Sequence, residues 1–300
     1  AGVGPVFGPI LGALYGPSAL LWIVIGTIFA GAVHDYFSGM LSVRYKGANV
    51  PTIVGYNLGN VAKQVMRVFA VILLLLVGVV FVAAPAGLLA KLTPDYMDQM
   101  FWVAVIFAYY FLATILPIDK IIGRLYPLFG AVLIIMAVGM TVTMFTNGCE
   151  FYNWASFPNN HPQQLPIFPL VFITIACGAL SGFHATQSPL MSRCLSNEKQ
   201  GKAVFYGGMV AEGFIGLVWA TVGMTFYTSP EALAAAGGPA NVVNETARAL
   251  MGPVGGVLAI LGVVALPVTS GDTAFRAARL TIAEMFNFKQ SAIPARLAIA

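Results

Sequence analysis

Long apolar segments follow one another along nearly the whole chain, and few charged residues interrupt them. Hydrophobic residues make up 59% of the 300 residues, and charged residues make up only 9%. A soluble protein of this length needs more surface charge to stay dissolved. A helical run of roughly 20 apolar residues matches the thickness of a bilayer. The sequence therefore predicts an all-α integral membrane protein that crosses the bilayer many times.

The apolar runs give approximate boundaries for the membrane-spanning helices. Residues 1–15 are expected to belong to an earlier span, and residues 293–300 read as the start of a further one. The chain is therefore expected to be a fragment of a longer protein, folded as a single polytopic membrane domain over residues 1–300. The complete spans are predicted at 17–40, 67–90, 100–117, 125–146, 167–183, 204–227 and 253–270.

Basic residues are distributed unequally between the two sets of loops. Thirteen of the 15 Lys and Arg residues fall in alternate loops, and only Lys91 and Arg248 fall in the others. The positive-inside rule places the first set in the cytoplasm. The longest outer loop is then 147–166, in which His161 is expected to be solvated. This regular alternation supports the predicted number of spans.

Two stretches, 2–16 and 176–189, mix Gly, Pro and hydroxyl residues into apolar sequence. Unpaired backbone groups are costly in a bilayer, so such breaks persist only where protein or a water-lined cavity satisfies them. The topology makes these stretches elements one and six, running in opposite directions. An inverted five-plus-five helix repeat requires this relation, and paired discontinuous helices indicate a transporter's binding site.

The first stretch has two interpretations. Glycines recur every four residues from Gly4 to Gly16, which is typical of a small face for close helix packing. However, Pro5 and Pro9 remove two backbone donors within about one turn, which packing does not require. The substrate-binding candidates predicted here are Gly2, Gly4, Pro5 and Gly8.

The second stretch gathers many hydrogen-bonding groups at the end of an apolar run. Pro189 is expected to bias Ser188 away from helical geometry. Such groups are expensive at membrane depth unless they face water, substrate or ions. A cytoplasmic helix end would account for Gln187 and Ser188 more simply. The substrate-binding candidates predicted here are Ser181, Gly182, Phe183, His184, Thr186 and Gln187.

Few titratable residues fall inside the apolar spans, and each is a functional hypothesis by default. Burial would suit Glu212 to load and release a proton, but it could equally be a structural carboxylate paired with a cytoplasmic Lys or Arg. His34 and Asp35 could relay a proton. Pairing of this dipeptide with Arg44 or with a neighbouring helix is the structural alternative.

A hydroxyl cluster closes the span expected at 253–270. Hydroxyl and carboxylate oxygens suit hard cations, so Thr269, Ser270, Asp272 and Thr273 could bind a coupling sodium ion together with carbonyls near residues 2–4. Alternatively, the hydroxyls bond to carbonyls of their own helix, and Arg276 or Arg279 neutralises Asp272. No other metal and no organic cofactor is expected; sodium or a proton is the candidate coupling ion.

Four motifs together resemble the carbon starvation protein CstA family. They are GPVFGPILGALYGP, GTIFAGAVHDYFSGMLSVRYKG, SGFHATQSPLMSR and TSGDTAFRAAR. The resemblance extends over essentially the whole chain and implies a LeuT-like fold of the amino acid–polyamine–organocation superfamily. It also implies uptake of peptides across the bacterial inner membrane during carbon starvation, with the broken helices holding substrate. In this resemblance the cluster at Thr269, Ser270 and Thr273 corresponds to a sodium site.

Several alternatives stay open at this point. The resemblance also covers a pyruvate symporter of the same fold, and a nutrient-sensing membrane protein is a further class. An enzyme is not expected, because the sequence has no HExxH motif, no paired-aspartate motif and no Ser–Lys pair on a span. The expected partners are the lipid bilayer and a peptide or pyruvate, without nucleic acid. The sequence does not choose an oligomeric state.

Overall fold

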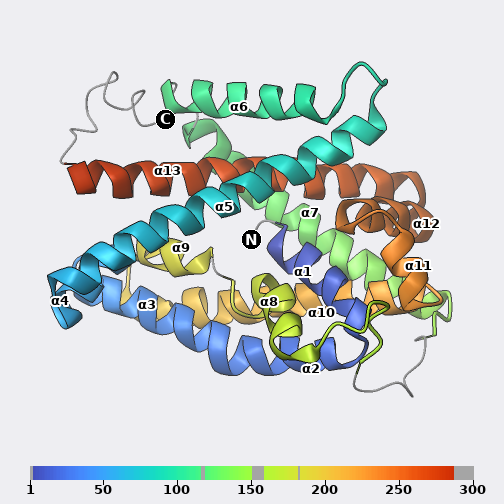
Figure 1. Ribbon diagram of the computed structural model, residues 1–300, viewed down its shortest axis with the longest axis horizontal. Coiled ribbons are helices and arrows are strands. Elements are labelled where there is room, and N and C mark those ends of the chain that lie inside the picture. The colour runs from blue at the N-terminus through green and yellow to red at the C-terminus, as the bar shows by residue number, and fades with distance from the viewer. Residues whose placement is uncertain (1–2, 116–118, 151–158, 182, 287–300) are drawn as a thin grey trace. The chain divides into compact units, whose positions relative to one another are not determined.

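The computed structural model describes residues 3–115, 119–150, 159–181 and 183–286. Within these ranges the chain is helical with connecting turns and contains no β-strand (Figure 1). The predicted all-α character is therefore confirmed for the described residues. Four of their helical runs are long and apolar enough to cross a membrane, namely Ser18–Arg44, Asn60–Leu92, Pro127–Thr146 and Glu198–Phe226.

The elements follow one another in chain order. The first part of the chain contains α1 (Gly4–Gly12), η1 (Ala13–Tyr15), α2 (Ser18–Ile25), η2 (Gly26–Gly31), α3 (Ala32–Arg44), α4 (Val50–Leu58), α5 (Asn60–Leu92), α6 (Gln99–Ile115) and α7 (Asp119–Thr146). The second part contains α8 (Ile167–Ala179), α9 (His184–Met191), η4 (Ser192–Cys194), η5 (Glu198–Gln200), η6 (Lys202–Gly207), α10 (Gly208–Phe226), α11 (Pro230–Ala235), α12 (Pro239–Ile260), η7 (Leu261–Ala265) and α13 (Leu266–Phe286).

The observed helix ends differ from several expected span ends, and two of these differences concern α8 and α13. The span expected at 167–183 stops earlier, because α8 ends at Ala179. The span expected at 253–270 continues through π-helical η7 into α13. The apolar run fades near residue 270 because an amphipathic helix follows, in which the alanines at 274, 277 and 278 are buried. The hydropathy changes at this point, but the helix does not end.

The chain folds into two compact units, each assembled from three separate segments. The first unit comprises Ala1–His34, Leu128–Ser181 and Tyr206–Leu266, and the second comprises Asp35–Pro127, Gly182–Phe205 and Pro267–Ala300. Each unit has its own packed interior. The expectation of a single membrane domain over residues 1–300 stays a prediction.

In the first unit, α1 packs closely against α8 and α10. Gly12 faces the side chain of Ile175 on α8 at a distance that leaves little room for a Cβ atom. Gly178 and Gly216 likewise approach Pro9. Small residues allow helix backbones to come close, which is how membrane helices gain packing contacts. The core of this unit is thus built on the glycines that the sequence places in α1, α8 and α10.

In the second unit, α5 packs against α4 and α6. Its residue Leu74 lies in one buried cluster with Ala274 and Ala277 of α13. A Cβ atom on Gly78 would meet the ring of Phe275, so α13 also approaches α5 at a glycine. These contacts hold α13, the helix of the predicted ion cluster, against the long span α5.

The chain passes between the units at irregular places in its described helices. π-Helical η2 precedes the passage after His34, and π-helical η6 contains the passage after Phe205. Pro127 and Pro267 stand at two others, and the interruption between α8 and α9 marks another. π-Turns and prolines are the places where helices most often bend. The division into units therefore follows local features of the backbone.

Candidate functional site

The first Gly- and Pro-rich stretch is helical in its described part. Residues 4–12 form α1 and residues 13–15 continue it as a 3₁₀ turn, so the interruption expected within 2–16 is not found there. Pro5 occupies the first turn of α1, where its missing N–H costs nothing. Pro9 removes only one interior hydrogen bond. The glycine-packing interpretation is thus supported for Gly8, which is buried, whereas Gly2 lies outside the described residues.

The second stretch is interrupted as expected. Leu180 has φ −124° at the end of α8, and Ser181 has φ +44°. Their N–H groups fold back onto the carbonyl of Ala176, at 2.8 and 2.6 Å. Gly182 lies outside the described residues, so its predicted role in substrate binding stays a prediction.

The position of the interruption corrects one expectation. Ser188 is helical, because α9 runs through Pro189 to Met191 and continues as η4. The hydroxyl of Ser42 on α3 lies 3.0 Å from the Pro189 carbonyl and 2.9 Å from the Ser192 hydroxyl. Ser42 is fully buried. These contacts stabilise the end of α9 against α3.

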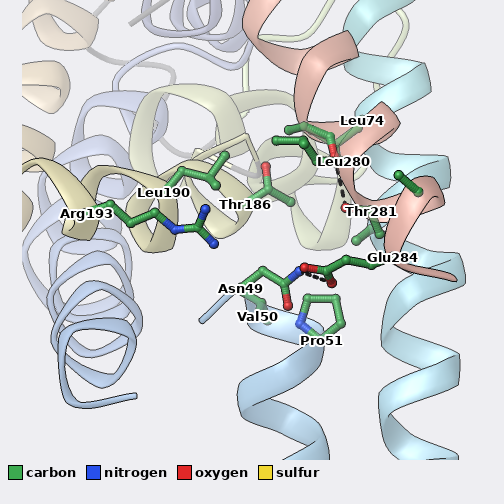
Figure 2. Close-up of a pocket in the computed structure, with 13 residues that line it drawn as sticks. Asn49, Val50, Pro51, Leu74, Thr186, Leu190, Arg193, Leu280, Thr281 and Glu284 are labelled. Carbon is green, nitrogen blue, oxygen red and sulfur yellow. Dashed lines mark hydrogen bonds between the residues drawn. The ribbon is translucent and has the colours of Figure 1, made fainter. Parts of the chain in front are cut away.

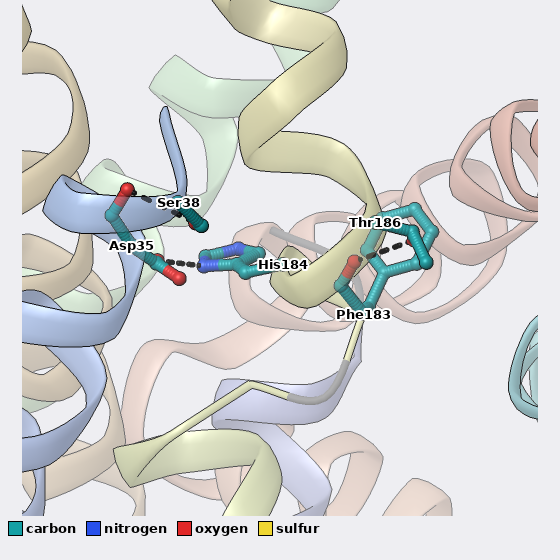
Figure 3. A network of polar contacts seen from close by, with 5 residues as sticks. All are labelled: Asp35, Ser38, Phe183, His184 and Thr186. Carbon is teal, nitrogen blue, oxygen red and sulfur yellow. Dashed lines mark hydrogen bonds and ion pairs between the residues drawn. The ribbon is translucent and has the colours of Figure 1, made fainter. Parts of the chain in front are cut away.

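A buried aspartate contacts a partly buried histidine at the start of α9. Nδ1 of His184 is 2.6 Å from Oδ2 of Asp35, whose side chain is 3% exposed (Figure 3). Asp35 belongs to α3, and the Ser38 hydroxyl donates to its backbone carbonyl at 3.2 Å. The sequence proposed Asp35 for ion coupling and His184 for substrate binding, but it did not predict that they touch. This contact agrees with the predicted alternative in which the dipeptide pairs with a neighbouring helix rather than with Arg44.

The adjacent residue His34 has different surroundings. Its side chain is exposed, whereas that of Asp35 is buried. Successive residues of an α-helix point about 100° apart, so one of them can face the interior while the other does not. The expected relay through His34 and Asp35 therefore receives no support from their placement, and Asp35 with His184 is the pair that the structure brings together.

The other candidates of α9 have several roles. The ring of Phe183 packs edge-to-face on that of Phe81, with centroids 5.6 Å apart. The Thr186 hydroxyl donates to the carbonyl of Phe183 at 3.0 Å (Figure 3). Gln187 is buried, and so is Ser181. Of these residues, Thr186 lines a cavity, whereas Phe183 stabilises the start of α9.

The cavity beside Thr186 measures about 370 Å³ and lies within the second unit. The residues that line it come from α4, α5, α9 with η4, and α13 (Figure 2). Its apolar wall includes Leu74, Leu190 and Leu280, and its polar groups include Arg193 and Glu284. A volume of this size is typical of small-molecule sites. The cavity therefore provides space for a solute next to the second half of the interrupted helix.

Sequence reasoning missed Asn49, Arg193 and Glu284 as cavity residues. In the sequence, Arg193 contributed only to the distribution of basic residues between loops, although it is the last residue of the motif that contains His184. Asn49 precedes a Val–Pro–Thr sequence, a recognisable signal for a helix N-cap, and its side chain does cap α4 by accepting from the Thr52 N–H at 3.0 Å. Nothing local in the sequence connects Glu284 with either residue.

Glu212 is buried in the interior of α10, in the first unit. The next residue, Gly213, approaches the side chain of Thr27 in π-helical η2 so closely that a Cβ atom would clash. The carboxylate therefore lies near a tightly packed helix contact, and it does not line the cavity beside Thr186. Whether it carries a coupling proton stays a prediction.

The predicted ion cluster is distributed along α13. Thr269 and Ser270 are buried, and the Thr273 hydroxyl donates to the carbonyl of Thr269 at 3.3 Å. Asp272 accepts a hydrogen bond from Arg276 at 3.0 Å. Thr273 thus bonds to a carbonyl of its own helix, and Arg276 pairs with Asp272, as the alternative to an ion site predicted for these two residues. Gly4 belongs to the other unit and Gly2 is not described, so a shared sodium cage stays a prediction.

Asp272 and Arg276 also line a larger cavity of about 820 Å³ in the second unit. Arg279 lines it as well, and its remaining walls are aromatic and aliphatic side chains of α5, α6 and α13, among them Phe107 and Phe275. Such a wall matches the lipid-like surroundings expected between spans. The smaller cavity is the better candidate for a polar solute, because it is lined by Thr186 and Leu190 of α9, whereas Asp272 and Arg276 in the larger cavity pair with each other.

Comparison with known proteins finds one matching family and relatives that carry its name. The chain matches the family described as Carbon starvation protein CstA over residues 1–96 and 95–257. An uncharacterized membrane protein of Haemophilus influenzae is 51% identical over 284 residues, covering 78% of this chain and 76% of that protein. Peptide transporter CstA of Campylobacter jejuni is 30% identical over 73% of this chain, and that of Escherichia coli K12 is 28% identical over 83%.

The chain spans 40% of the length of the Campylobacter protein and 45% of that of the Escherichia protein. These relatives are named as a membrane protein and as transporters rather than as enzymes. Their names agree with the apolar helices, and the family match covers the motifs around α1, α3 and α9. The chain is a membrane protein that belongs to the carbon starvation protein CstA family.

Proposed function

We propose that this chain forms the central part of a secondary active transporter that takes up peptides across the bacterial inner membrane during carbon starvation. The observation that carries the proposal is the contact between His184 and Asp35 at the start of α9, directly after a helix interruption. Ionisable groups inside a membrane are costly and mark substrate or proton pathways. Relatives named as peptide transporters support the same class of function.

The proposed architecture is the LeuT-like inverted repeat, with α1 as part of element one and α8 with α9 as element six. The interruption after Ala179 supports it, because half-helix ends at membrane depth direct N–H groups or free carbonyls at charged solutes. An amide-rich helix start attracts a carboxylate, and free carbonyls attract an amine. A peptide carries both groups, whereas pyruvate carries only the carboxylate.

We propose the proton as the coupling ion and the Asp35–His184 pair as its carrier. His titrates near neutral pH, and a contacting carboxylate can share or pass on its proton. The sodium alternative on α13 has less support, because Asp272 pairs with Arg276. Glu212 is the second proton candidate, and it is tested alongside.

The test is uptake into proteoliposomes that contain the purified protein. Labelled dialanine and labelled pyruvate are offered under an imposed proton gradient or an imposed sodium gradient. The variants Asp35→Asn and His184→Gln are compared with His34→Gln, which changes an exposed histidine on the same helix. Glu212→Gln tests the second candidate. Exchange of dialanine across the membrane without any gradient is measured for every variant.

We expect the proton gradient to drive dialanine uptake in the unmodified protein and in His34→Gln. Asp35→Asn should lose roughly tenfold or more of this concentrative uptake while retaining exchange, because binding persists without coupling. If Glu212→Gln loses the coupling and Asp35→Asn keeps it, Glu212 of α10 carries the proton instead of the Asp35–His184 pair. Pyruvate uptake without dialanine uptake would establish the symporter alternative, and uptake of neither would favour a sensor.

A further inference from the structure

The cavity beside α9 presents one cation and one anion that do not bind each other. Arg193 of η4 and Glu284 of α13 both line it, and Figure 2 shows the two side chains directed toward a common space near Thr186. Their bonded contacts within the described residues are to other groups. The cavity therefore has separate charges of opposite sign above an apolar wall.

One short connection, between α3 and α4, positions both charged side chains. Nε of Arg193 donates to the carbonyl of Gly47 at 2.8 Å, which leaves both Nη groups of the guanidinium for another acceptor. Nδ2 of Asn49 donates to Oε2 of Glu284 at 2.8 Å. The opposite end of the Asn49 amide caps α4, so this side chain is itself fixed.

Gly47 matters for the placement of Arg193. Its φ of +81° is a conformation that favours glycine. A Cβ atom there would lie 2.8 Å from Cγ of Arg193. The arginine side chain therefore lies directly over this glycine, with its guanidinium held by the glycine's own carbonyl. Such a fixed orientation reduces the entropy that a ligand must offset when it binds.

We infer that this cavity binds the two charged ends of a short peptide, with Arg193 binding the carboxylate and Glu284 binding the ammonium group. The inference rests on the proposed function and names a substrate contact for it. A guanidinium offers two parallel donors that match a carboxylate. The apolar wall formed by Leu74, Leu190 and Leu280 accommodates the side chains between the ends.

The dimensions fit a dipeptide or tripeptide. An extended chain spans at most about 3.6 Å per residue, so a dipeptide reaches roughly 7 Å. The cavity of about 370 Å³ lies within the range of small-ligand sites. By the positive-inside rule the connection of residues 45–49 is cytoplasmic. The site therefore lies on the exit side of an uptake route, where a peptide is released.

A phospholipid headgroup offers the same chemistry. Phosphatidylethanolamine carries a phosphate and an ammonium group, and a cavity near the membrane surface is within its reach. Two observations distinguish a peptide from this lipid. Peptide binding depends on both free ends of the peptide, and it is saturable in a bilayer that contains no phosphatidylethanolamine. The experiment therefore varies the ligand ends and the lipid together.

The experiment measures dialanine binding by isothermal titration of the protein in nanodiscs of phosphatidylglycerol. N-acetyl-dialanine lacks the cation, and dialanine amide lacks the anion. The variants are Arg193→Gln and Glu284→Gln. Glu198→Gln and Lys199→Gln are the matched controls, because both remove an exposed charge on the neighbouring η5.

The unmodified protein and both controls should bind dialanine roughly tenfold or more tightly than either blocked ligand. Arg193→Gln should bind dialanine and its amide equally, and Glu284→Gln should bind dialanine and its acetylated form equally. Unchanged discrimination in both variants overturns the inference. Displacement of dialanine by added phosphatidylethanolamine, lost in both variants, also overturns it and assigns the site to lipid.

The failure of this site is distinguishable from that of the proposed function. If the unmodified protein transports dialanine in proteoliposomes while Arg193→Gln and Glu284→Gln bind and transport it normally, only the site is wrong. If the unmodified protein neither binds nor transports dialanine, the peptide function itself is wrong, and the cavity loses its proposed ligand.

Discussion

Residues next to one another in the sequence can have opposite surroundings, and His34 and Asp35 are the clearest case. Both stand out as ionisable residues inside an apolar span, but only Asp35 is buried and contacts His184. The register of α3 determines this difference. Removing one partner of a buried ion pair typically costs roughly 3–5 kcal/mol, which is why the coupling test uses isosteric amides and checks exchange.

His161, which lies outside the predicted membrane spans, also has surroundings that the sequence did not predict. The sequence suggested a solvated residue, but its ring packs on that of Tyr15 with centroids 4.7 Å apart, and it is 8% exposed. Its Nδ1 accepts the N–H of Gln163 at 3.2 Å, which requires that this nitrogen carry no proton. Burial lowers the pKa of His161 below its usual value of 6.5.

This lowered pKa predicts a loss of stability in acid. Below about pH 6.5 the unfolded chain takes up a proton at His161 before the folded protein does, so the free energy of unfolding falls as the pH drops toward the lower folded pKa. Thermal unfolding in detergent at a series of pH values measures it. His161→Gln should lose this part of the pH dependence and His34→Gln should keep it; an equal slope in His161→Gln would contradict the assignment.

At the scale of the elements, the interruption between α8 and α9 is the feature on which the proposed mechanism depends. It arises from a few residues: Ser181 takes a positive φ, and two N–H groups turn back onto Ala176. Pro189, the stronger breaker by sequence, is instead accommodated inside α9. Contacts from Ser42 on another helix stabilise that arrangement.

The backbone of Ser181 gives an element-scale prediction. A residue with a side chain pays about 1–2 kcal/mol in the left-handed region, and a β-branched residue pays more. Ser181→Gly should therefore keep the thermal stability and the dialanine uptake of the unmodified protein. Ser181→Val should lower both, whereas the same change at the exposed Ser196, between η4 and η5, should lower neither. Equal behaviour of the glycine and valine variants would remove the interruption from the mechanism.

At the scale of the whole molecule, the charge asymmetry predicts which loops face the cytoplasm. Cys194 is exposed at the end of η4, in a basic connection predicted to be cytoplasmic. Cys149 is half-buried after α7, in the longest outer loop. These native residues therefore report on opposite sides of the membrane without any insertion into the chain.

Thiol labelling tests this topology. In variants that retain only Cys149 or only Cys194, with the other cysteines changed to serine, a membrane-impermeant maleimide should label Cys149 in sealed right-side-out vesicles and Cys194 in inside-out vesicles. Detergent-permeabilised vesicles, in which both residues react, are the control. Labelling of Cys194 in sealed right-side-out vesicles would invert the topology and move the cavity beside α9 to the outer surface.

The sequence alone determined the properties that depend on local composition. Apolar runs of this length predicted helices because a helix pairs its backbone groups within one segment, as a bilayer requires, and the described residues are helical. The motifs around His184 and Asp35 predicted the family that the comparison then showed. Glycine and proline residues indicated the region of the interruption between α8 and α9. They did not indicate the residue at which the helix breaks, because glycine also occurs at helix contacts and proline also occurs in the first turn of helices.

Only the tertiary structure decided which side chains meet. Asp35 and His184 lie 149 residues apart in the chain, and Asn49 and Glu284 lie 235 apart. No periodicity or spacing connects groups at such distances, because helix packing sets both register and rotation for every span at once. The same packing buried His161, exposed His34 and made a cavity from residues that the sequence presents only as ordinary surface charges.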